Sequence, residues 1–205
     1  LKTPIASVRL AAESALTSLE RDDGMTKSFL EQILRDSDRM NELISDLLDL
    51  SAMESSDVFM EAFDLHDVVA NEISYLSKQN KKRISYKKKK VEINANFDDI
   101  SLAVKNLIKN ALKYSPPEEN ILIQIEENDK SVRCSFQDFG SGISESDQEK
   151  IFERFYRVDK GRSRKVGWTG LGLAIVKHAL DRNNAVIEIV SELGHGSKFT
   201  IVFEK

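Results

Sequence analysis

The sequence is poor in cysteine, proline and tryptophan. It has one cysteine, three prolines and one tryptophan among 205 residues. A single cysteine, Cys134, excludes an internal disulfide, and its place within "SVRCSFQD" indicates a thiol buried in a strand. The chain is therefore not a disulfide-stabilised scaffold, and a reducing compartment is expected.

Long apolar runs and an excess of positive charge are also missing. No stretch approaches the roughly 20 apolar residues that a membrane-spanning helix needs, and no leader-like segment precedes the first predicted helix, so we expect a soluble chain. The net charge of −4 argues against nucleic acid as a partner of the whole chain. The local run "KKRISYKKKK" alternates with strand residues and has no aromatic besides Tyr86, which favours an exposed, solvated surface.

The first quarter of the chain consists almost entirely of helix-forming residues. The one break is "RDDGMT", where aspartates and a glycine favour a turn, so two antiparallel helices are predicted. The second helix carries an apolar stripe at coiled-coil spacing. Its members are Ile33, Met40, Leu43, Leu47 and Leu50, widened by Leu30, Ile44 and Leu48. One hairpin cannot bury so wide a stripe, which predicts a homodimeric four-helix bundle. Packing of the stripe on the chain's own second domain is the alternative.

The helical pattern stops around "AMESSDV", which predicts a helical domain at residues 1–55 and a second domain at residues 56–205. The second domain mixes helices with strands that we expect to be antiparallel, so an α+β sandwich with helices on one face is predicted. The expected elements are helices at 65–77, 98–114 and 171–183, and strands at 83–87, 91–96, 121–127, 131–138, 185–192 and 197–204.

Two glycine-rich stretches carry candidate chemistry. "DFGSGI" follows a strand, and by itself it fits a merely structural turn equally well. "GWTGLGLAIV" places Gly170 and Gly172 at the start of an apolar helix, where free N–H groups and the helix dipole favour a phosphate. Neither stretch fits a dinucleotide fingerprint or a P-loop, because Ile175 replaces the last glycine of the first and no glycine precedes Lys-Ser or Lys-Thr.

A third stretch, "NLIKNALKYS", places Asn106 and Asn110 one helical turn apart. Amide oxygens suit Mg²⁺, which takes few protein ligands when nucleotide phosphates complete its shell. Lys113 would add positive charge and Tyr114 a flat surface for a base. The exposed polar face of an amphipathic helix is the alternative.

Five stretches taken in order resemble the H, N, G1, F and G2 boxes of sensor histidine kinases. They are "LKTPIAS", "NLIKNALKYS", "DFGSGIS", "IFERFYRVD" and "TGLGLAIVKHAL", and together they span essentially the entire chain. The resemblance implies a dimerisation and phosphotransfer hairpin, followed by an α/β sandwich that binds ATP and is of the type shared by gyrase, histidine kinases and MutL.

The resemblance also implies roles for individual residues. Asn110 would chelate Mg²⁺ and Asp138 would accept a hydrogen bond from the adenine amino group, while Thr3, Asn110 and Arg157 would be the catalytic residues. The nucleotide contacts that it implies are Asn106, Asn110, Lys113, Tyr114, Asp138, Gly140, Gly142, Ile143, Phe152, Tyr156, Arg157, Thr169, Gly170, Leu171, Gly172 and Leu173.

The segment between Arg157 and Thr169 resembles the mobile ATP lid of the family. Its cations would meet a triphosphate, although plain solvation of a loop is the alternative; they are Lys160, Arg162, Arg164 and Lys165. The chain departs from the family before Gly170, where the family usually has a second glycine in the lid. This chain reads "GWTGLG", with the bulky Trp168 directly after Gly167.

In the family the H box reads His-Glu-Leu-Lys-Thr-Pro, so the acceptor histidine would stand two residues before Leu1. We therefore expect the sequence to begin within this motif. Thr3 would orient water for dephosphorylating the response regulator, and Pro4 would kink the helix. The remaining histidines, His66, His178 and His195, are expected to be structural.

Together these features predict a kinase that binds Mg-ATP, phosphorylates a histidine and passes the phosphoryl group to an aspartate of a response regulator. The chain would be a cytoplasmic part of a plasma-membrane sensor, with the membrane reached only through segments outside this sequence. The alternative is a nucleotide-binding, dimerising scaffold without phosphotransfer. An ATPase of the gyrase or MutL kind would need a general-base carboxylate in the N-box helix, where Asn106 is neutral.

Overall fold

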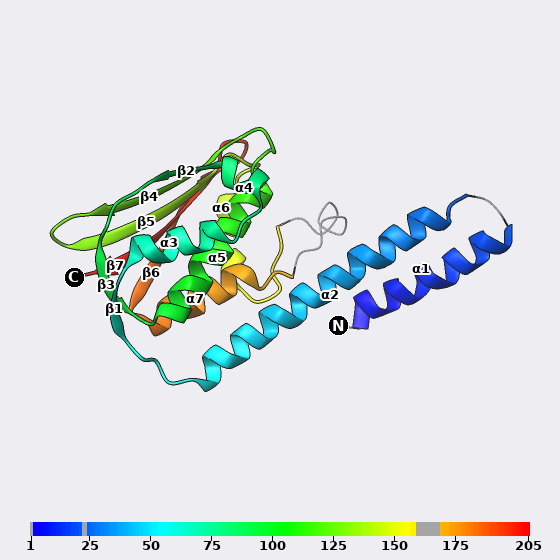
Figure 1. Cartoon of the computed structure of the whole chain (residues 1–205), viewed down its shortest axis with the longest axis horizontal. Coiled ribbons are helices and arrows are strands. Elements are labelled where there is room, and N and C mark those ends of the chain that lie inside the picture. The colour runs from blue at the N-terminus through cyan, green and yellow to red at the C-terminus, as the bar shows by residue number, and fades with distance from the viewer. Residues whose placement is uncertain (1, 22–23, 159–168) are drawn as a thin grey trace. The chain divides into compact units, whose positions relative to one another are not determined.

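The computed structural model describes residues 2–21, 24–158 and 169–205 (Figure 1). These residues form two compact units. The first contains the chain up to Leu50 and Thr169, and the second contains Ser51–Val158 and Gly170–Lys205. Within the described ranges, no helix has both the length and the apolar character needed to cross a membrane.

The first unit is the predicted helical hairpin. It consists of α1 (Lys2–Arg21) and most of α2 (Thr26–Ser55), with Gly24 in the turn at a φ of 72°. The two helices are joined by a hydrogen bond from the Ser7 hydroxyl to the buried carboxylate of Asp36, at 2.6 Å. The last turn of α2, from Ser51 onward, belongs to the second unit.

The second unit is an α+β sandwich, as predicted. Its sheets are five-stranded, in the order β2-β4-β5-β7-β6, and two-stranded, formed by β1 and β3. The strands are β1 (Glu61–Asp64), β2 (Ile84–Lys87), β3 (Glu92–Ala95), β4 (Ile121–Glu127), β5 (Ser131–Asp138), β6 (Ala185–Glu192) and β7 (Gly196–Glu204). The helices are α3 (Leu65–Ser74), α4 (Lys78–Lys82), α5 (Phe97–Tyr114), α6 (Glu145–Gln148), α7 (Gly172–Arg182) and the 3-10 turn η1 (Lys150–Phe152).

The expectation that all strands are antiparallel is wrong for one pair. The β4–β5, β5–β7 and β6–β7 pairs are antiparallel, but β2 runs parallel to β4, with Ile84 opposite Ile121. After β2 the chain forms β3 and α5 before it enters β4 in the same direction. Such a crossover joins parallel strands, and strand periodicity does not reveal it because periodicity carries no direction.

Four short elements, β1, α4, α6 and η1, differ from the predicted pattern. The helix expected to reach residue 77 ends at Ser74, and α4 follows as a separate helix, "KQNKK", that has no apolar residue. The strand β1 has only four residues and pairs with β3 outside the main sheet. Elements this short lack enough turns or alternations to show a period.

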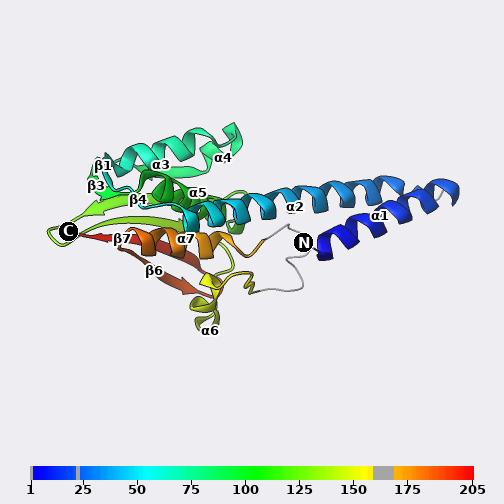
Figure 2. The ribbon, with the colours of Figure 1, turned by 90° about the horizontal axis from the view of Figure 1, so that it is seen from below.

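Helices α3, α5 and α7 lie side by side over one face of the five-stranded sheet (Figures 1 and 2). Their apolar faces and the inward residues of the strands form the core. Its largest fully buried side chains are Phe136, Leu65, Ile100, Leu107, Ile108, Ile121, Ile123, Leu171, Ile175, Leu180, Ile201 and Val68. Cys134 is buried in β5 as predicted, and burial raises the pKa of its thiol.

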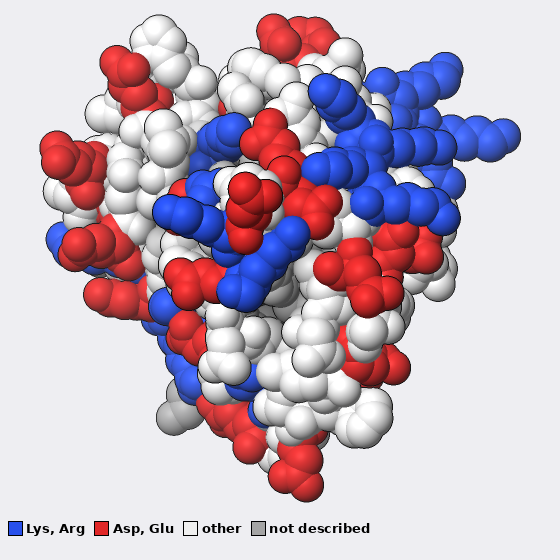
Figure 3. Space-filling view, turned by 90° about the vertical axis from the view of Figure 1, so that its left-hand side faces the viewer, with Lys and Arg blue, Asp and Glu red and all other residues white. Residues whose placement is uncertain are grey.

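Arg83, within the basic run, binds the C-terminal end of α5. Its guanidinium donates at 3.1 Å to the carbonyl of Leu112, one of the last carbonyls of the helix, which have no intrahelical partners. It also donates at 2.8 Å to the carbonyl of Pro116, just beyond the helix. The neighbouring lysines Lys81, Lys82, Lys87, Lys88 and Lys90 are exposed. Figure 3 shows Lys and Arg side chains gathered at the upper right of the view. The run is thus partly a structural contact and partly a solvated surface.

We expect Phe136→Ala to lower the free energy of unfolding of the second unit by about 3–5 kcal/mol, because a fully packed phenyl ring is lost and a cavity is left. The ring is 1% exposed in β5. Phe59→Ala is the matched control, since Phe59 is 73% exposed. Urea denaturation followed by circular dichroism measures both variants, and an equal effect of the two would contradict this description of the core.

Candidate functional site

The pairing of α5 with α7 brings two predicted site residues together. Asn106 is buried on α5, and its amide N–H donates to the Leu102 carbonyl at 2.9 Å. Its Oδ1 would lie 3.1 Å from a Cβ atom placed on Gly172, the first residue of α7. A side chain at position 172 would therefore press on this amide. The N-box asparagine and the second G2-box glycine are direct neighbours.

The N-terminal end of α7 has the features predicted for anion binding. An apolar residue, Leu171, occupies the N-cap position, so its side chain cannot accept from the first-turn N–H groups. The Leu171 side chain is fully buried in the core, and Leu173 is half-buried. The N–H groups and the dipole of this helix favour a negative charge near Gly172.

Asp138 ends β5 and is 3% exposed. Its Oδ1 accepts hydrogen bonds from the backbone N–H of Gly140, at 2.9 Å, and of Ser197, at 3.2 Å. Burial raises the pKa of this carboxyl group, and the two hydrogen bonds act in the opposite direction. In the described part of the chain both bonds go to Oδ1, so Oδ2 is left to accept from a ligand.

The loop after Asp138 runs along the C-terminal end of α5. The N–H of Phe139 donates to the Ser115 hydroxyl at 3.1 Å. A Cβ atom at Gly140 would lie 2.5 Å from the carbonyl oxygen of Tyr114, so only glycine fits there. The G1 box and the end of the N box are therefore in contact.

The next residues of the loop are held by the β6–β7 hairpin. The N–H of Ile143 donates to the Ser191 hydroxyl at 2.8 Å, and the Gln148 amide donates to the carbonyls of Ile143 and Ser191. Gly142 has a φ of 68°, in the left-handed region that favours glycine. Strand β6, through Ser191, and helix α6, through Gln148, thus fix this loop. The loop is therefore in place before a ligand binds.

The F box contacts the G2 box through the backbone. The N–H of Phe155 donates to the Gly170 carbonyl at 2.8 Å. Tyr156 is positioned by its hydroxyl, which donates to Asp147 at 2.6 Å, and Phe152 is half-buried in η1. Hydrogen bonds from Ser144 and from Tyr156 lower the pKa of the Asp147 carboxyl group.

Three predicted residues act on one another electrostatically. Burial raises the pKa of the Tyr114 hydroxyl; the Arg157 guanidinium lowers it, and the Asp138 carboxylate raises it further. Arg157 is half-buried, and Lys113, on the neighbouring face of α5, is exposed. One positive charge of the F box therefore acts at the place where the N and G1 boxes meet.

Asn110 lies one turn after Asn106 on α5 and is half-buried. Across the residues that the structure describes, no cluster of His, Cys, Asp and Glu could hold a metal ion. An amide oxygen together with oxygens of a nucleotide is a donor set that suits Mg²⁺.

Some predicted residues are not placed with this group. Thr169 lies in the first unit, where its hydroxyl donates to Asp46 of α2 at 2.6 Å. Thr3 belongs to helix α1, and its side chain is outside the described residues. The lid positions Lys160, Arg162, Arg164, Lys165, Gly167 and Trp168 also lie outside the described residues.

Sequence reasoning missed the residues that support the loops. Ser115, Ser191 and Ser197 each make a hydrogen bond that holds the G1 loop, and Asp147 holds Tyr156. Only Ser115 had a local signal, because it directly follows the N-box tyrosine at the end of α5.

His66 has structural surroundings. The His66 N–H donates to Asp64, the N-cap of α3, and its ring nitrogen Nδ1 is 2.7 Å from the Tyr86 hydroxyl. The two rings also stack, with centroids 5.5 Å apart. His66 is thus a packing residue, as predicted.

Comparison with known proteins assigns both parts of the chain. Residues 95–205 match the family described as histidine kinase-, DNA gyrase B-, and HSP90-like ATPase, and residues 1–56 match the His Kinase A (phospho-acceptor) domain. The sensor-like histidine kinase SenX3 of Mycolicibacterium smegmatis is 33% identical over 98% of this chain and 54% of its own length. The phosphate regulon sensor protein PhoR of Pseudomonas aeruginosa is 35% identical over 99% of this chain and 47% of its own length.

The chain thus spans about half the length of the curated relatives that it matches. Among solved structures, the Acinetobacter baumannii histidine kinase AdeS has the same fold, with a TM-score of 0.69 at 23% identity over 100% of this chain and 96% of that one. The order of the five boxes, the contacts among four of them and these matches lead to one conclusion. The chain belongs to the sensor histidine kinase family of two-component systems, and it comprises the cytoplasmic-core domains of that family.

Proposed function

We propose that this chain is the catalytic core of a two-component sensor histidine kinase that binds Mg-ATP and transfers its γ-phosphoryl group to a histidine. The observation that carries the proposal is the meeting of four boxes around α5 and α7. Asn106 adjoins Gly172, Gly140 adjoins Tyr114, and Phe155 binds Gly170. A phosphate-attracting helix start and a buried carboxylate then belong to one compact unit.

Asp138 would select adenine. Its Oδ2 can accept from the exocyclic amino group, which guanine lacks at the corresponding edge. Gly140 and Gly142 let the loop come close to the ring, and Tyr114 offers an aromatic surface beside it. Because Oδ1 is already used to hold the loop, the acceptor direction is set before the base arrives.

The phosphates would lie toward the start of α7 and the charge of Arg157. First-turn N–H groups at Gly172 and the helix dipole attract anions, and Lys113 adds a second positive charge. Asn110 would hold Mg²⁺ through its amide oxygen, with Asn106 next to it on α5. Bound Mg²⁺ would neutralise phosphate charge, which lowers the barrier to phosphoryl transfer.

The transfer itself is a displacement at phosphorus. A ring nitrogen of the acceptor histidine forms a bond to the γ-phosphorus, the bond to the β–γ bridging oxygen breaks, and ADP leaves. An acidic residue next to that histidine would take the imidazole proton. The phosphohistidine would then donate its phosphoryl group to an aspartate of a response regulator receiver domain. Thr3 would orient water for the reverse, dephosphorylating activity.

Exposed apolar residues on the hairpin support a homodimer. The stripe residues Leu43 and Leu50 are buried, but the flanking residues are exposed on α2, with Leu48 at 64%. The other exposed large apolar residues of the hairpin are Ile5, Leu10, Leu16, Leu19, Met25, Leu30, Leu34 and Ile44. Pairing two hairpins into a four-helix bundle would cover this surface. We further propose that the whole protein is a plasma-membrane sensor with this part in the cytoplasm.

A nucleotide-binding scaffold without phosphotransfer is the second candidate, because it would use the same ATP site and the same hairpin. It predicts nucleotide binding without any labelled histidine.

Asp138→Asn should weaken ATP binding about 10- to 100-fold, because a charged acceptor is lost and an amide N–H then faces the adenine amino group. The variant keeps Oδ1 as an acceptor for Gly140 and Ser197, so the loop itself should hold. Isothermal titration calorimetry measures the affinity, with the exposed turn residue Asp129→Asn as the matched control. Unchanged affinity in Asp138→Asn would refute the adenine assignment.

Phosphotransfer is tested in trans. This chain is mixed with a longer form of the protein that carries the acceptor histidine and the substitution Asn110→Asp, and γ-labelled Mg-ATP is added. We expect acid-labile label on the longer chain, because the unaltered ATP site of the short chain serves its partner. Introducing Asn110→Asp into the short chain as well should abolish the label. No label in the first mixture, followed by none when the short chain is extended to the histidine, would leave the scaffold as the function.

Leu48→Glu combined with Leu34→Glu should convert a dimer into a monomer, because two charges would be buried at the proposed helix interface. Analytical ultracentrifugation across a concentration series measures the change. Val190→Glu is the control, since Val190 is also exposed, at 73%, but lies on β6 of the second unit. A monomeric parent protein, or a dimer that survives the double substitution, would contradict the bundle.

A further inference from the structure

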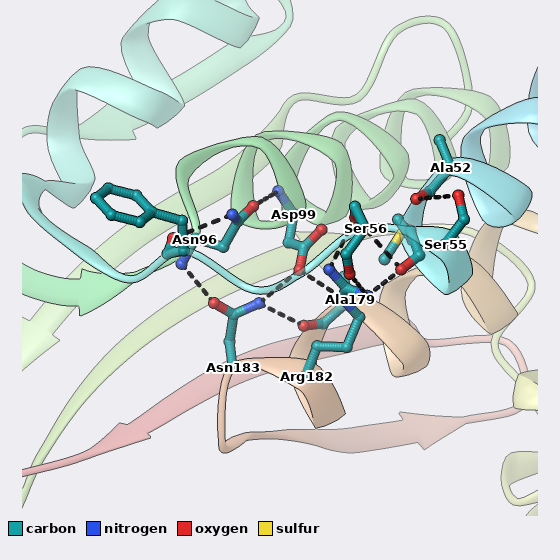
Figure 4. Close-up of polar contacts among 10 residues, drawn as sticks. Ala52, Ser55, Ser56, Asn96, Asp99, Ala179, Arg182 and Asn183 are labelled. Atoms are coloured by element: carbon teal, nitrogen blue, oxygen red, sulfur yellow. Dashed lines mark hydrogen bonds and ion pairs between the residues drawn. The ribbon is translucent and has the colours of Figure 1, made fainter.

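A polar network that is buried at Asp99 and Asn183 holds the C-terminal end of α2. A helix end leaves its last carbonyl groups without intrahelical partners. Here the guanidinium of Arg182 supplies the donors: Nη1 donates to the carbonyl oxygens of Met53 and of Ser56, the latter at 3.1 Å, and Nη2 donates to the Ser56 hydroxyl, also at 3.1 Å. Figure 4 shows the Arg182 side chain reaching from the end of α7 to the end of α2.

The third nitrogen of Arg182 binds α5. Its Nε donates to Oδ2 of Asp99 at 2.9 Å, in an ion pair whose side chains are 13% and 5% exposed. Asp99 lies in the first turn of α5. An arginine that only neutralised this carboxylate would not need the rest of its fork, whereas here every nitrogen has a defined acceptor on α5 or at the end of α2.

Asn183 completes the network from the position after Arg182. Its side-chain amide donates to Asp99 Oδ2 at 3.1 Å and to the Ala179 carbonyl at 2.7 Å, and its oxygen accepts from the Asn96 N–H at 2.6 Å. Asn96 caps α5 by accepting from the Asp99 N–H, and its side chain donates to the carbonyl of Phe59 in the segment that leaves α2. Both α2 and the segment after it are therefore tied to this network (Figure 4).

Helices α5 and α7, which meet in this network, also carry residues of the proposed ATP site, farther along each helix. Helix α7 begins at Gly172 and ends at Arg182, and α5 begins with Asp99 in its first turn and carries Asn106 and Asn110 farther along. A second ion pair joins the last turn of α2 to the F-box segment, from Arg154 to Glu54 at 2.6 Å. The side chains of that pair are 52% and 48% exposed, so solvent screens it more strongly than the pair of Arg182 with Asp99.

We propose that Arg182, Asp99 and Asn183 form a clasp that positions the catalytic domain for phosphoryl transfer. The clasp makes the last turn of α2 move with the ends of α5 and α7, so that a displacement of α2 reaches the helices of the ATP site. These are positioning residues, because they lie at the helix ends remote from Gly172 and Asn110. The proposal rests on the proposed kinase function, since transfer to a histidine is the step that the clasp positions.

The substitution Arg182→Lys distinguishes the effect of the clasp from the effect of the ion pair with Asp99. A lysine keeps a positive charge for the buried Asp99, but a single ammonium group cannot reproduce the planar fork that reaches α2 and α5 at once. We expect the urea midpoint of this variant to stay near that of the parent, while amide hydrogen exchange at residues 51–58 becomes at least several-fold faster. Arg133→Lys is the matched control, because Arg133 pairs with Glu188 on the surface of β5 and β6.

The functional arm uses the form of the protein that carries the acceptor histidine. Arg182→Lys should lower the rate of histidine phosphorylation about 10- to 100-fold, because a loosened catalytic domain is less often in the transfer geometry. The KM for ATP should not change, because the nucleotide residues are untouched. Asn183→Ala should act in the same direction, and Arg133→Lys should leave both parameters unchanged.

Each outcome decides the matter. Faster exchange at residues 51–58 together with a lower rate at constant KM supports the clasp. A parent that phosphorylates its histidine and an Arg182→Lys variant that matches it in rate overturn the clasp but not the kinase function. A rise in KM alone, or no change in exchange at residues 51–58, also overturns it. A parent that binds ATP without phosphorylation overturns the proposed function and the positioning role with it.

Discussion

The packing of α5 against α7 over the sheet is the constraint on which the candidate site depends. Both helices bury an apolar face on the strands, with residues such as Leu107 and Ile175 fully enclosed. This packing brings Asn106 so close to Gly172 that a side chain there would press on the amide. An amide-bearing helix face and an uncapped, glycine-rich helix start thus become neighbours. The chemistry attributed to the site follows from that contact.

Side chains from distant parts of the chain satisfy the backbone groups at the ends of these elements. Arg83 binds the carbonyls at the end of α5, Arg182 binds those at the end of α2, and Asp138 accepts from the N–H groups of the loop that follows it. Unsatisfied buried backbone groups are costly, so these contacts fix the loops and helix ends in one arrangement. Rigid loops of this kind are what a nucleotide site requires.

Local patterns predicted the elements that are long and periodic. The helix expected at 98–114 is found at 97–114, and the helix expected at 171–183 is found at 172–182. The parallel pairing of β2 with β4 could not be predicted, because alternation carries no direction. The contacts of Ser197 with Asp138 and of Arg182 with Met53 join residues 59 and 129 positions apart, so only the tertiary fold reveals them. The glycine and asparagine motifs could be predicted from the sequence because each one lies within a single short stretch of the chain.

The most direct test of this account is to titrate the unaltered chain with ATP and with GTP by calorimetry, in Mg²⁺ and again in excess chelator. The account predicts that ATP binds at least about 10-fold more tightly than GTP, because the Asp138 carboxylate accepts from the adenine amino group, and that removal of Mg²⁺ weakens ATP binding. Equal affinity for the two nucleotides, or affinity that does not depend on the metal, would contradict the assignment of Asp138 and Asn110 and with it the proposed site.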